Sequence, residues 1–207
     1  TGESKKYKVA NNSVDIGKEL SVEEASNSDR KSLIFVGSFD RRKRLDLLIE
    51  GYYKYREQLK GIEMVLVGDG DCFSEIQSSV QNFGLEGSIK LLGRINDPAE
   101  LSLIYKRCLV SLSYGQAGLS VLQGLGNGVP FITTFNAISG GEISHIRDGI
   151  NGYLVDDNID SFYEYVLLIV RNEDVAVKLR LNALAHFRQN CSLENMVASF
   201  LSVIKEK

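Results

Sequence analysis

The feature that most constrains the fold is a regular alternation of short apolar runs with longer amphipathic stretches. The apolar runs are rich in β-branched residues, and they lie at 33–36, 64–67, 89–92, 109–112, 131–133 and 153–155. Helical patterns are predicted between and after them, at about 45–59, 71–83, 98–107, 119–127 and 158–171. This alternation is typical of repeated βα units around a parallel sheet. We predict a doubly wound, Rossmann-like α/β fold with a parallel six-stranded sheet and helices on both faces.

The composition excludes several classes of partner. The 207 residues carry a net charge of −3 and no apolar run long enough to span a membrane, so we expect neither nucleic-acid binding nor a transmembrane segment. Cys72, Cys108 and Cys191 are widely spaced, without the pairing of a disulfide framework or a zinc site. His145 and His186 have no partner at ligand spacing in the sequence, so no metal site is predicted.

The loop at 37–44, GSFDRRKR, places four cations where a helix begins, after the first predicted strand. Cations are unfavourable at a helix N-terminus, so an anionic ligand such as a phosphate is expected to compensate them. The alternative is a solvated basic loop in which Asp40 and Asp46 act as partial counterions.

The loop that begins VGDGDCF at residue 67 superficially matches a dinucleotide-binding fingerprint. Its third glycine is replaced by Phe73, and this βα unit is not the first of the sheet. We therefore predict a tight strand-to-helix turn here, in preference to a phosphate site.

The segment SYGQAGLSVLQGLGNGVP, at 113–130, is the most informative part of the chain. Its small residues at 115, 117 and 118 allow a ligand to approach the backbone where a helix starts, which makes a second diphosphate seat. Leu119 and Gln123 share a helical face, so the Gln123 amide is expected to reach ligand hydroxyls. The alternative is a tightly packed helix without a ligand.

Taken in order, the segments LIFVGSFDRRKRLDLLIEG, MVLVGDGD, IKLLGRI, GLSVLQGLGNGVPFIT and DGINGYLV resemble the donor-binding domain of the glycosyltransferase group 1 family, also called family 4. The resemblance covers about residues 31–190. It implies half of a GT-B enzyme, usually retaining and metal-independent. Such an enzyme transfers a sugar from a nucleotide diphosphate donor, which is a substrate and not a cofactor, and no cofactor is expected.

The resemblance assigns donor contacts residue by residue. Lys43 matches the family lysine on the diphosphate, and Arg42 is expected to assist it, with Arg41 beside it. Arg94 lies where relatives hold the base through the backbone. The turn Ala117, Gly118, Leu119 and Ser120 matches the backbone that faces the diphosphate.

The chain departs from the family at two glutamates that are normally eight positions apart. The second, on the ribose, aligns with Gln123, which retains hydrogen-bonding capacity. The first, near the donor sugar, aligns with Gly115 and leaves no carboxylate. We hypothesise that Glu142, in the GGE loop, supplies the missing acidic group; the alternative is a surface glutamate in a glycine-rich turn.

The resemblance also predicts how the chain is organised. Residues 1–30 match the linker at the end of an N-terminal acceptor domain, 31–190 the donor domain, and 191–207 a helix that packs back on the N-terminal domain. The chain alone is expected to bind the donor without transferring sugar. The acceptor, a glycan or a lipid-linked glycan, is expected on the missing domain, so any membrane contact of the cytoplasmic enzyme is peripheral.

The expected activity of the whole protein is transfer of a hexose or N-acetylhexosamine. The chain resembles family variants with a GxAGLS turn and an NAISGGE loop, and this resemblance implies a UDP-sugar and a bacterial surface polysaccharide, such as O-antigen or capsule. Two alternatives remain at this stage: a degenerate, non-catalytic nucleotide-sugar-binding module, and a nucleotide-sugar epimerase with the same fold.

Overall fold

The computed structural model describes residues 12–17, 21, 24 and 29–205 of the chain, and its centre is one parallel sheet. The strands are β1 (Ser32–Val36), β2 (Glu63–Val67), β3 (Ile89–Gly93), β4 (Cys108–Leu112), β5 (Phe131–Thr134) and β6 (Gly152–Val155). They are hydrogen-bonded in the order β3-β2-β1-β4-β5-β6, and every pair is parallel. The predicted doubly wound sheet is confirmed.

Helices follow the strands as the amphipathic patterns predicted. They are α2 (Leu45–Tyr55), α3 (Phe73–Asn82), α4 (Pro98–Tyr105), α5 (Ser120–Gly126), α6 (Ile159–Arg171), α7 (Glu173–Asn190) and α8 (Leu193–Lys205). The first ends earlier than predicted, because the chain from residue 56 to 61 continues as turns. Two short 3-10 helices, η1 (Arg41–Lys43) and η2 (Glu142–His145), were not predicted, since three or four residues carry no periodic signal.

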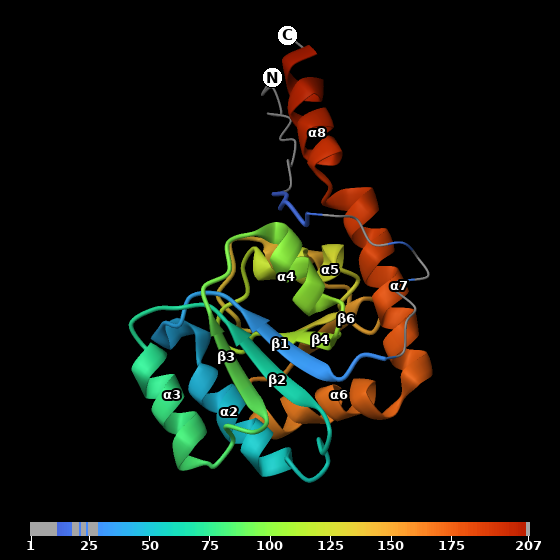
Figure 1. The fold of residues 1–207 in the computed structure, drawn as a ribbon. Coiled ribbons are helices and arrows are strands. Elements are labelled where there is room, and N and C mark those ends of the chain that lie inside the picture. Colours follow the sequence, from blue (N-terminus) through green and yellow to red (C-terminus); the bar gives the residue numbers. More distant parts are fainter. Residues whose placement is uncertain (1–11, 18–20, 22–23, 25–28, 206–207) are drawn as a thin grey trace, which may run out of the picture.

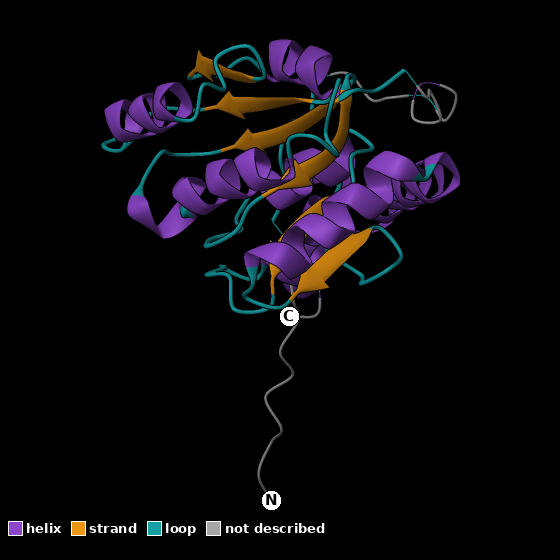
Figure 2. Ribbon diagram, turned by 90° about the horizontal axis from the view of Figure 1, so that it is seen from below, coloured by secondary structure: helices purple, strands orange, loops and turns teal. Residues whose placement is uncertain are grey.

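The two faces of the sheet are covered by different helices, as Figures 1 and 2 show. Leu33 and Phe35 point into the larger core, beneath α2, α3 and α6, whereas Ile34 joins a core with residues of α4. This alternation follows from the two-residue period of a strand. A third apolar cluster lies between α5, the end of α7 and the segment around Ile16.

The connection reverses direction between β1 and β4, which are neighbours in the sheet. The chain first builds outward through β2 and β3, then crosses back to β4 and builds the other way. Ligands of open α/β sheets bind at such a switch point, outside the carboxyl ends of the strands. The loops after β1 and β4 are therefore the place to look for a site.

Helix α5 lies close to α7 because a glycine occupies the contact. A Cβ added to Gly126 would lie 2.7 Å from Ile16 Cγ2 and 3.0 Å from the ring of Phe187. The contact fixes the position of α5, which begins directly after the turn at 117–119.

Helix α8 extends away from the body of the molecule (Figure 1). Ser192 caps it, its Oγ accepting from the Asn195 N–H at 3.3 Å. The apolar residues Leu193, Val197, Phe200 and Leu201 are 45–57% exposed. Within the described part of the chain, no helix is both long and apolar enough to cross a bilayer.

The α5–α7 contact predicts that Gly126→Ala destabilises the chain by about 1–3 kcal/mol, because the added methyl group overpacks the core. The same change in an exposed helix normally stabilises by about 1 kcal/mol, so the sign of the effect is diagnostic. Urea denaturation measures it. Gly87→Ala is the control, because a Cβ at Gly87 meets nothing within 4 Å; a stabilised Gly126→Ala protein would contradict the packing.

Candidate functional site

The loops after β1 and β4 are joined by hydrogen bonds at the switch point. The Gly115 N–H donates to the Lys43 carbonyl oxygen at 3.3 Å. The Lys43 Nζ donates in turn to the Gln116 carbonyl oxygen at 3.4 Å, and Ser113 Oγ donates to the same oxygen at 2.5 Å. Two motifs more than 70 residues apart in sequence thus form one site, since Lys43 and Gln116 are separated by 73 positions.

The cations of the first loop have different environments. Asp40 caps η1 and accepts from both Nε and Nη2 of Arg42 at 3.2 Å. The pKa of Asp40 lies below its usual value, and the largest cause is the hydrogen bonding of its carboxylate with the Arg42 side chain. Arg41 is highly exposed and pairs with Glu75 at 3.5 Å. Arg41 and Arg42 therefore have carboxylate partners within the protein. This agrees in part with the alternative of a solvated basic loop, in which Asp40 is one of the expected counterions.

Lys43 differs from its neighbours because it is buried, with 8% of its surface exposed. Burial is the main cause of a lowered pKa at its ammonium group, with Arg42 lowering it further and Asp40 opposing. A buried ammonium with one weak contact, to a carbonyl oxygen, is an unsatisfied cation. An anion bound next to Lys43 would supply the missing partner.

The turn before α5 presents unused backbone donors. Among the described residues, no hydrogen bond uses the N–H groups of Gly118, Leu119 or Ser120. Ala117 is buried, and its N–H donates to the Ile138 carbonyl at 2.9 Å, which anchors the turn. A Cβ on Gly118 would meet nothing within 4 Å, so space is open there. Successive free N–H groups of this kind form an anion-binding concavity.

Two glutamine side chains border this turn. Gln123 is half-buried and lies one helical turn into α5. Within the described part of the chain, its side chain has no hydrogen bond. Gln116 was not singled out from the sequence. Its Oε1 is buried and has no hydrogen-bond partner in the described part of the chain, so it is a polar group available to a ligand.

Position 115, where the family resemblance predicts a glutamate, has no room for a side chain. A Cβ on Gly115 would lie 2.1 Å from the Arg42 carbonyl oxygen and 2.9 Å from Arg44 Cγ. The backbones of the two loops are in contact at this point, so the close packing of the loops leaves no space for a carboxylate.

The loop after β2 supports the first loop. The Phe39 N–H donates to the Asp69 carbonyl, and the Cys72 N–H donates to the Phe39 carbonyl, both at 2.9 Å. A Cβ on Gly68 would lie 1.8 Å from the Gly37 oxygen. The glycines here allow two loops to touch, which agrees with the predicted tight turn.

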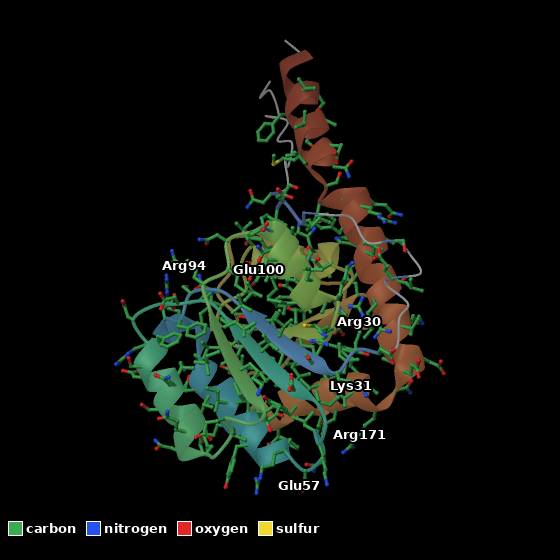
Figure 3. All side chains as sticks on the ribbon, in the orientation of Figure 1. Arg30, Lys31, Glu57, Arg94, Glu100 and Arg171 are labelled. Carbon is green, nitrogen blue, oxygen red and sulfur yellow. The ribbon has the colours of Figure 1, made fainter. Side chains whose placement is uncertain are left out.

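Arg94 lies at the same end of the sheet, beyond β3, whereas Lys31 lies at the start of β1 (Figure 3). Arg94 and Ile95 line a cavity of about 150 Å³ together with residues at the ends of β1 and β2, among them Ser38 and Asp69. Ser38 belongs to the same loop as Lys43, so this cavity borders the loop after β1. Both apolar and polar groups line it.

Glu142 is held within its own loop and by the N-terminal segment. Its carboxylate accepts from Asn12 Nδ2 at 3.1 Å, from the Gly140 N–H at 3.0 Å and from Ser139 Oγ at 3.3 Å. Burial acts to raise the pKa of Glu142, but hydrogen bonds from its own backbone, Asn12, Ser139 and Gly140 outweigh it, and the pKa is lowered. The carboxylate thus organises the loop after β5.

A second group of residues that the sequence did not indicate connects the loops after β1, β4 and β6. Arg44 has the left-handed φ of 50°, and its guanidinium carbon lies 5.5 Å from the centre of the Tyr114 ring. Arg44 Nη1 lies 3.9 Å from Asp157 Oδ1. Burial, then a hydrogen bond with Asp157, raises the pKa of Tyr114 to about 12. No sequence spacing connects these three positions.

With this geometry established, comparison with known proteins identifies the family. Residues 18–186 match the sequence family described as glycosyl transferases group 1. The chain belongs to this family. It is 29% identical, over 67% of its length, to the N-acetyl-alpha-D-glucosaminyl L-malate synthase of Bacillus anthracis, and 24% identical, over 86%, to the lipopolysaccharide core biosynthesis glycosyltransferase LpsE of Rhizobium meliloti (strain 1021).

This group 1 chain spans 35% and 52% of the lengths of those two relatives. Among solved structures, it resembles the Anabaena protein HepE, determined in complex with UDP and glucose, with a TM-score of 0.78 and 17% identity. The match covers 97% of this chain and 57% of HepE. At this identity the likeness establishes the fold.

The contact between the two loops predicts opposite outcomes for two neighbouring glycines. Gly115→Ala is expected to lower the free energy of unfolding by about 1–3 kcal/mol, because its methyl group collides with the Arg42 carbonyl. Gly118→Ala is expected to change it by less than about 0.5 kcal/mol. Chemical denaturation of both proteins checks this, and equal stability would argue against the backbone contact.

The Glu142 hydrogen bonds predict a pH-dependent contribution to stability. A carboxylate with a lowered folded pKa stabilises the chain above its unfolded pKa of about 4.3, and this is lost as pH falls through the folded pKa. Denaturation curves of Glu142→Gln and the unmodified chain are expected to differ at pH 6 and converge in acid. Asn12→Ala is expected to be intermediate, and parallel pH profiles would disprove the role.

Proposed function

We propose that the loops after β1 and β4 together bind the nucleoside diphosphate of an activated sugar. The observation that carries this proposal is the buried Lys43 ammonium beside the unused N–H groups of Gly118, Leu119 and Ser120. A diphosphate supplies the negative charge and the acceptor oxygens that these groups lack. Family membership independently favours a nucleotide-sugar donor.

The remaining groups of the site fit the other parts of such a ligand. The cavity lined by Arg94 and Ile95 is placed for the base, outside the ends of the first three strands. Gln123 follows the phosphate-facing turn by one helical turn, which suits hydrogen bonds to the ribose. Arg42 contributes positive charge to the loop, although Asp40 already accepts from it.

We propose further that the whole protein transfers a hexose or N-acetylhexosamine from a UDP-sugar to a glycan or lipid-linked acceptor of a bacterial surface polysaccharide. UDP is favoured by the likeness to HepE, and a polysaccharide product by the likeness to LpsE. Retention of configuration and independence of a metal in the transfer step rest on the family resemblance. The acceptor would be held by an N-terminal domain, with the enzyme on the cytoplasmic side of the membrane.

One observation favours a second candidate, a module that binds a nucleotide sugar without using it. No carboxylate occupies position 115, and Glu142 is engaged by Asn12 and its own loop. A transfer reaction would then draw its acidic group from elsewhere. Assay of the whole protein decides between the two: donor-dependent glycan product supports transfer, and binding without product supports the module. An epimerised donor, formed without any acceptor, would indicate the epimerase.

The proposed site predicts selective binding of UDP over GDP and ADP in calorimetric titrations of the chain. Lys43→Ala is expected to weaken UDP binding by about 10–100-fold, because a hydrogen bond to a charged group contributes about 1.5–3 kcal/mol. Gln123→Ala is expected to cost about 2–10-fold through the loss of neutral hydrogen bonds.

Lys60→Ala is the matched control, because Lys60 is exposed and lies between α2 and β2, at the opposite end of the sheet. It is expected to leave UDP binding unchanged. Equal affinity for the three diphosphates, or equal weakening by Lys43→Ala and Lys60→Ala, would point to general electrostatic attraction and overturn the proposed site.

A further inference from the structure

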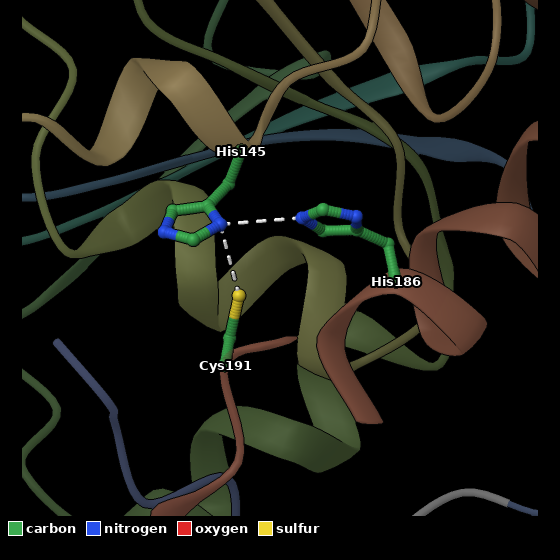
Figure 4. Close-up of side chains that lie close together, drawn as sticks. All are labelled: His145, His186 and Cys191. Carbon is green, nitrogen blue, oxygen red and sulfur yellow. Dashed lines mark hydrogen bonds between the residues drawn. The ribbon is translucent and has the colours of Figure 1, made fainter. Parts of the chain in front are cut away.

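Three residues that the donor site does not use come together at the end of α7. His145 Nδ1 lies 3.2 Å from His186 Nε2 and 3.2 Å from Cys191 Sγ, and all three side chains are buried (Figure 4). The three atoms lie within 4.8 Å of one another. The sequence does not show this cluster, because His145 is 41 positions from His186 and 46 from Cys191.

Hydrogen bonding accounts for only part of this arrangement. A neutral imidazole Nδ1 carries either one proton or one lone pair, so it forms one ordinary hydrogen bond. His145 Nδ1 has two close neighbours, a nitrogen and a sulfur, and it can form an ordinary hydrogen bond with only one of them. With both facing imidazole nitrogens unprotonated and Cys191 as the thiolate, three lone pairs would point to one place, as a metal ion requires.

The distances suit a tetrahedral ion. Zn–N bonds of about 2.0–2.1 Å and Zn–S bonds of about 2.3 Å place ligand nitrogens roughly 3.3 Å apart and a nitrogen and a sulfur roughly 3.6 Å apart. The two separations that involve His145 Nδ1, 3.2 Å each, therefore need to change by only a few tenths of an ångström, and the third pair, His186 Nε2 and Cys191 Sγ, lies within 4.8 Å. One thiolate with two imidazoles is a ligand set that Zn²⁺ prefers, and three protein ligands leave a fourth position for water.

The backbone around the cluster is held independently of any ion. The buried Asn151 side chain accepts from the Arg147 N–H at 2.7 Å and donates to the His145 carbonyl at 3.0 Å, which fixes the end of η2. Asn190 Nδ2 lies 3.3 Å from His186 Nδ1 and donates to the His186 carbonyl oxygen at 2.9 Å. An ion held by Nε2 places the His186 proton on Nδ1, so the Asn190 amide has to turn away from the ring when the ion binds.

We propose that His145, His186 and Cys191 bind one Zn²⁺ ion. The ion joins η2, in the loop after β5, to the end of α7. At its other end this loop is hydrogen-bonded to the donor-binding turn, through Ile138. Because α8 begins two residues after Cys191, the ion also fixes the point from which α8 leaves the body. The ion would lie outside the proposed diphosphate site.

Titration with Co²⁺ tests the site, because Co²⁺ replaces Zn²⁺ and is coloured. The reduced, chelator-treated chain, without a histidine tag, is expected to bind one Co²⁺. The spectrum should show the strong visible absorption of a tetrahedral ion and a thiolate-to-cobalt charge-transfer band. Added Zn²⁺ is expected to bleach both, and Cys191→Ser to abolish the charge-transfer band. His186→Gln is expected to weaken binding at least about tenfold.

Cys72→Ser is the matched control, because Cys72 is also buried but belongs to the core beneath α2 and α3. It is expected to retain the full spectrum. Circular dichroism confirms that each variant is folded, and His145→Gln replaces Cys191→Ser if that protein does not fold. Failure of the unmodified chain to bind one equivalent of Co²⁺, or a charge-transfer band that survives Cys191→Ser, overturns the proposal. Neither result depends on binding of UDP.

Discussion

The site depends on one backbone contact, between the loop after β1 and the loop after β4. The Gly115 N–H donates to the Lys43 carbonyl, and its α-carbon lies against the Arg42 carbonyl. This contact brings a buried ammonium and a row of unused N–H groups to the same place. It exists because β1 and β4 are adjacent, and their adjacency follows from the reversal of strand order that defines a doubly wound sheet.

The sheet and most helices were predictable because their signals are periodic. Six apolar runs became six strands, and the two-residue alternation at Leu33, Ile34 and Phe35 distributes them between the cores on opposite faces. The 3-10 helices were not predictable, although one carries Lys43 and the other carries Glu142 and His145. Elements this short are formed by caps and tertiary contacts, such as Asp40 accepting from the Arg42 N–H.

The sequence predicted which loops form the candidate site better than it predicted what each residue does there. Lys43 and the turn at 117–120 lie together as expected, whereas Arg42 is paired with Asp40. The three positions Arg44, Tyr114 and Asp157 could not be linked from the sequence, and neither could the two histidines and Cys191. Contacts between residues this far apart carry no local pattern, so only the fold reveals them.

The close packing at Gly115 also bears on how the sequences of the two loops can change. A Cβ at this position would collide with the Arg42 carbonyl and with Arg44 Cγ. A single substitution of Gly115 to glutamate would therefore clash with the opposite loop before its carboxylate reached a substrate. A side chain at position 115 requires the turn at 41–44 to change first. The two loops therefore constrain each other's sequences, and an acidic group at position 115 is difficult to introduce in one step.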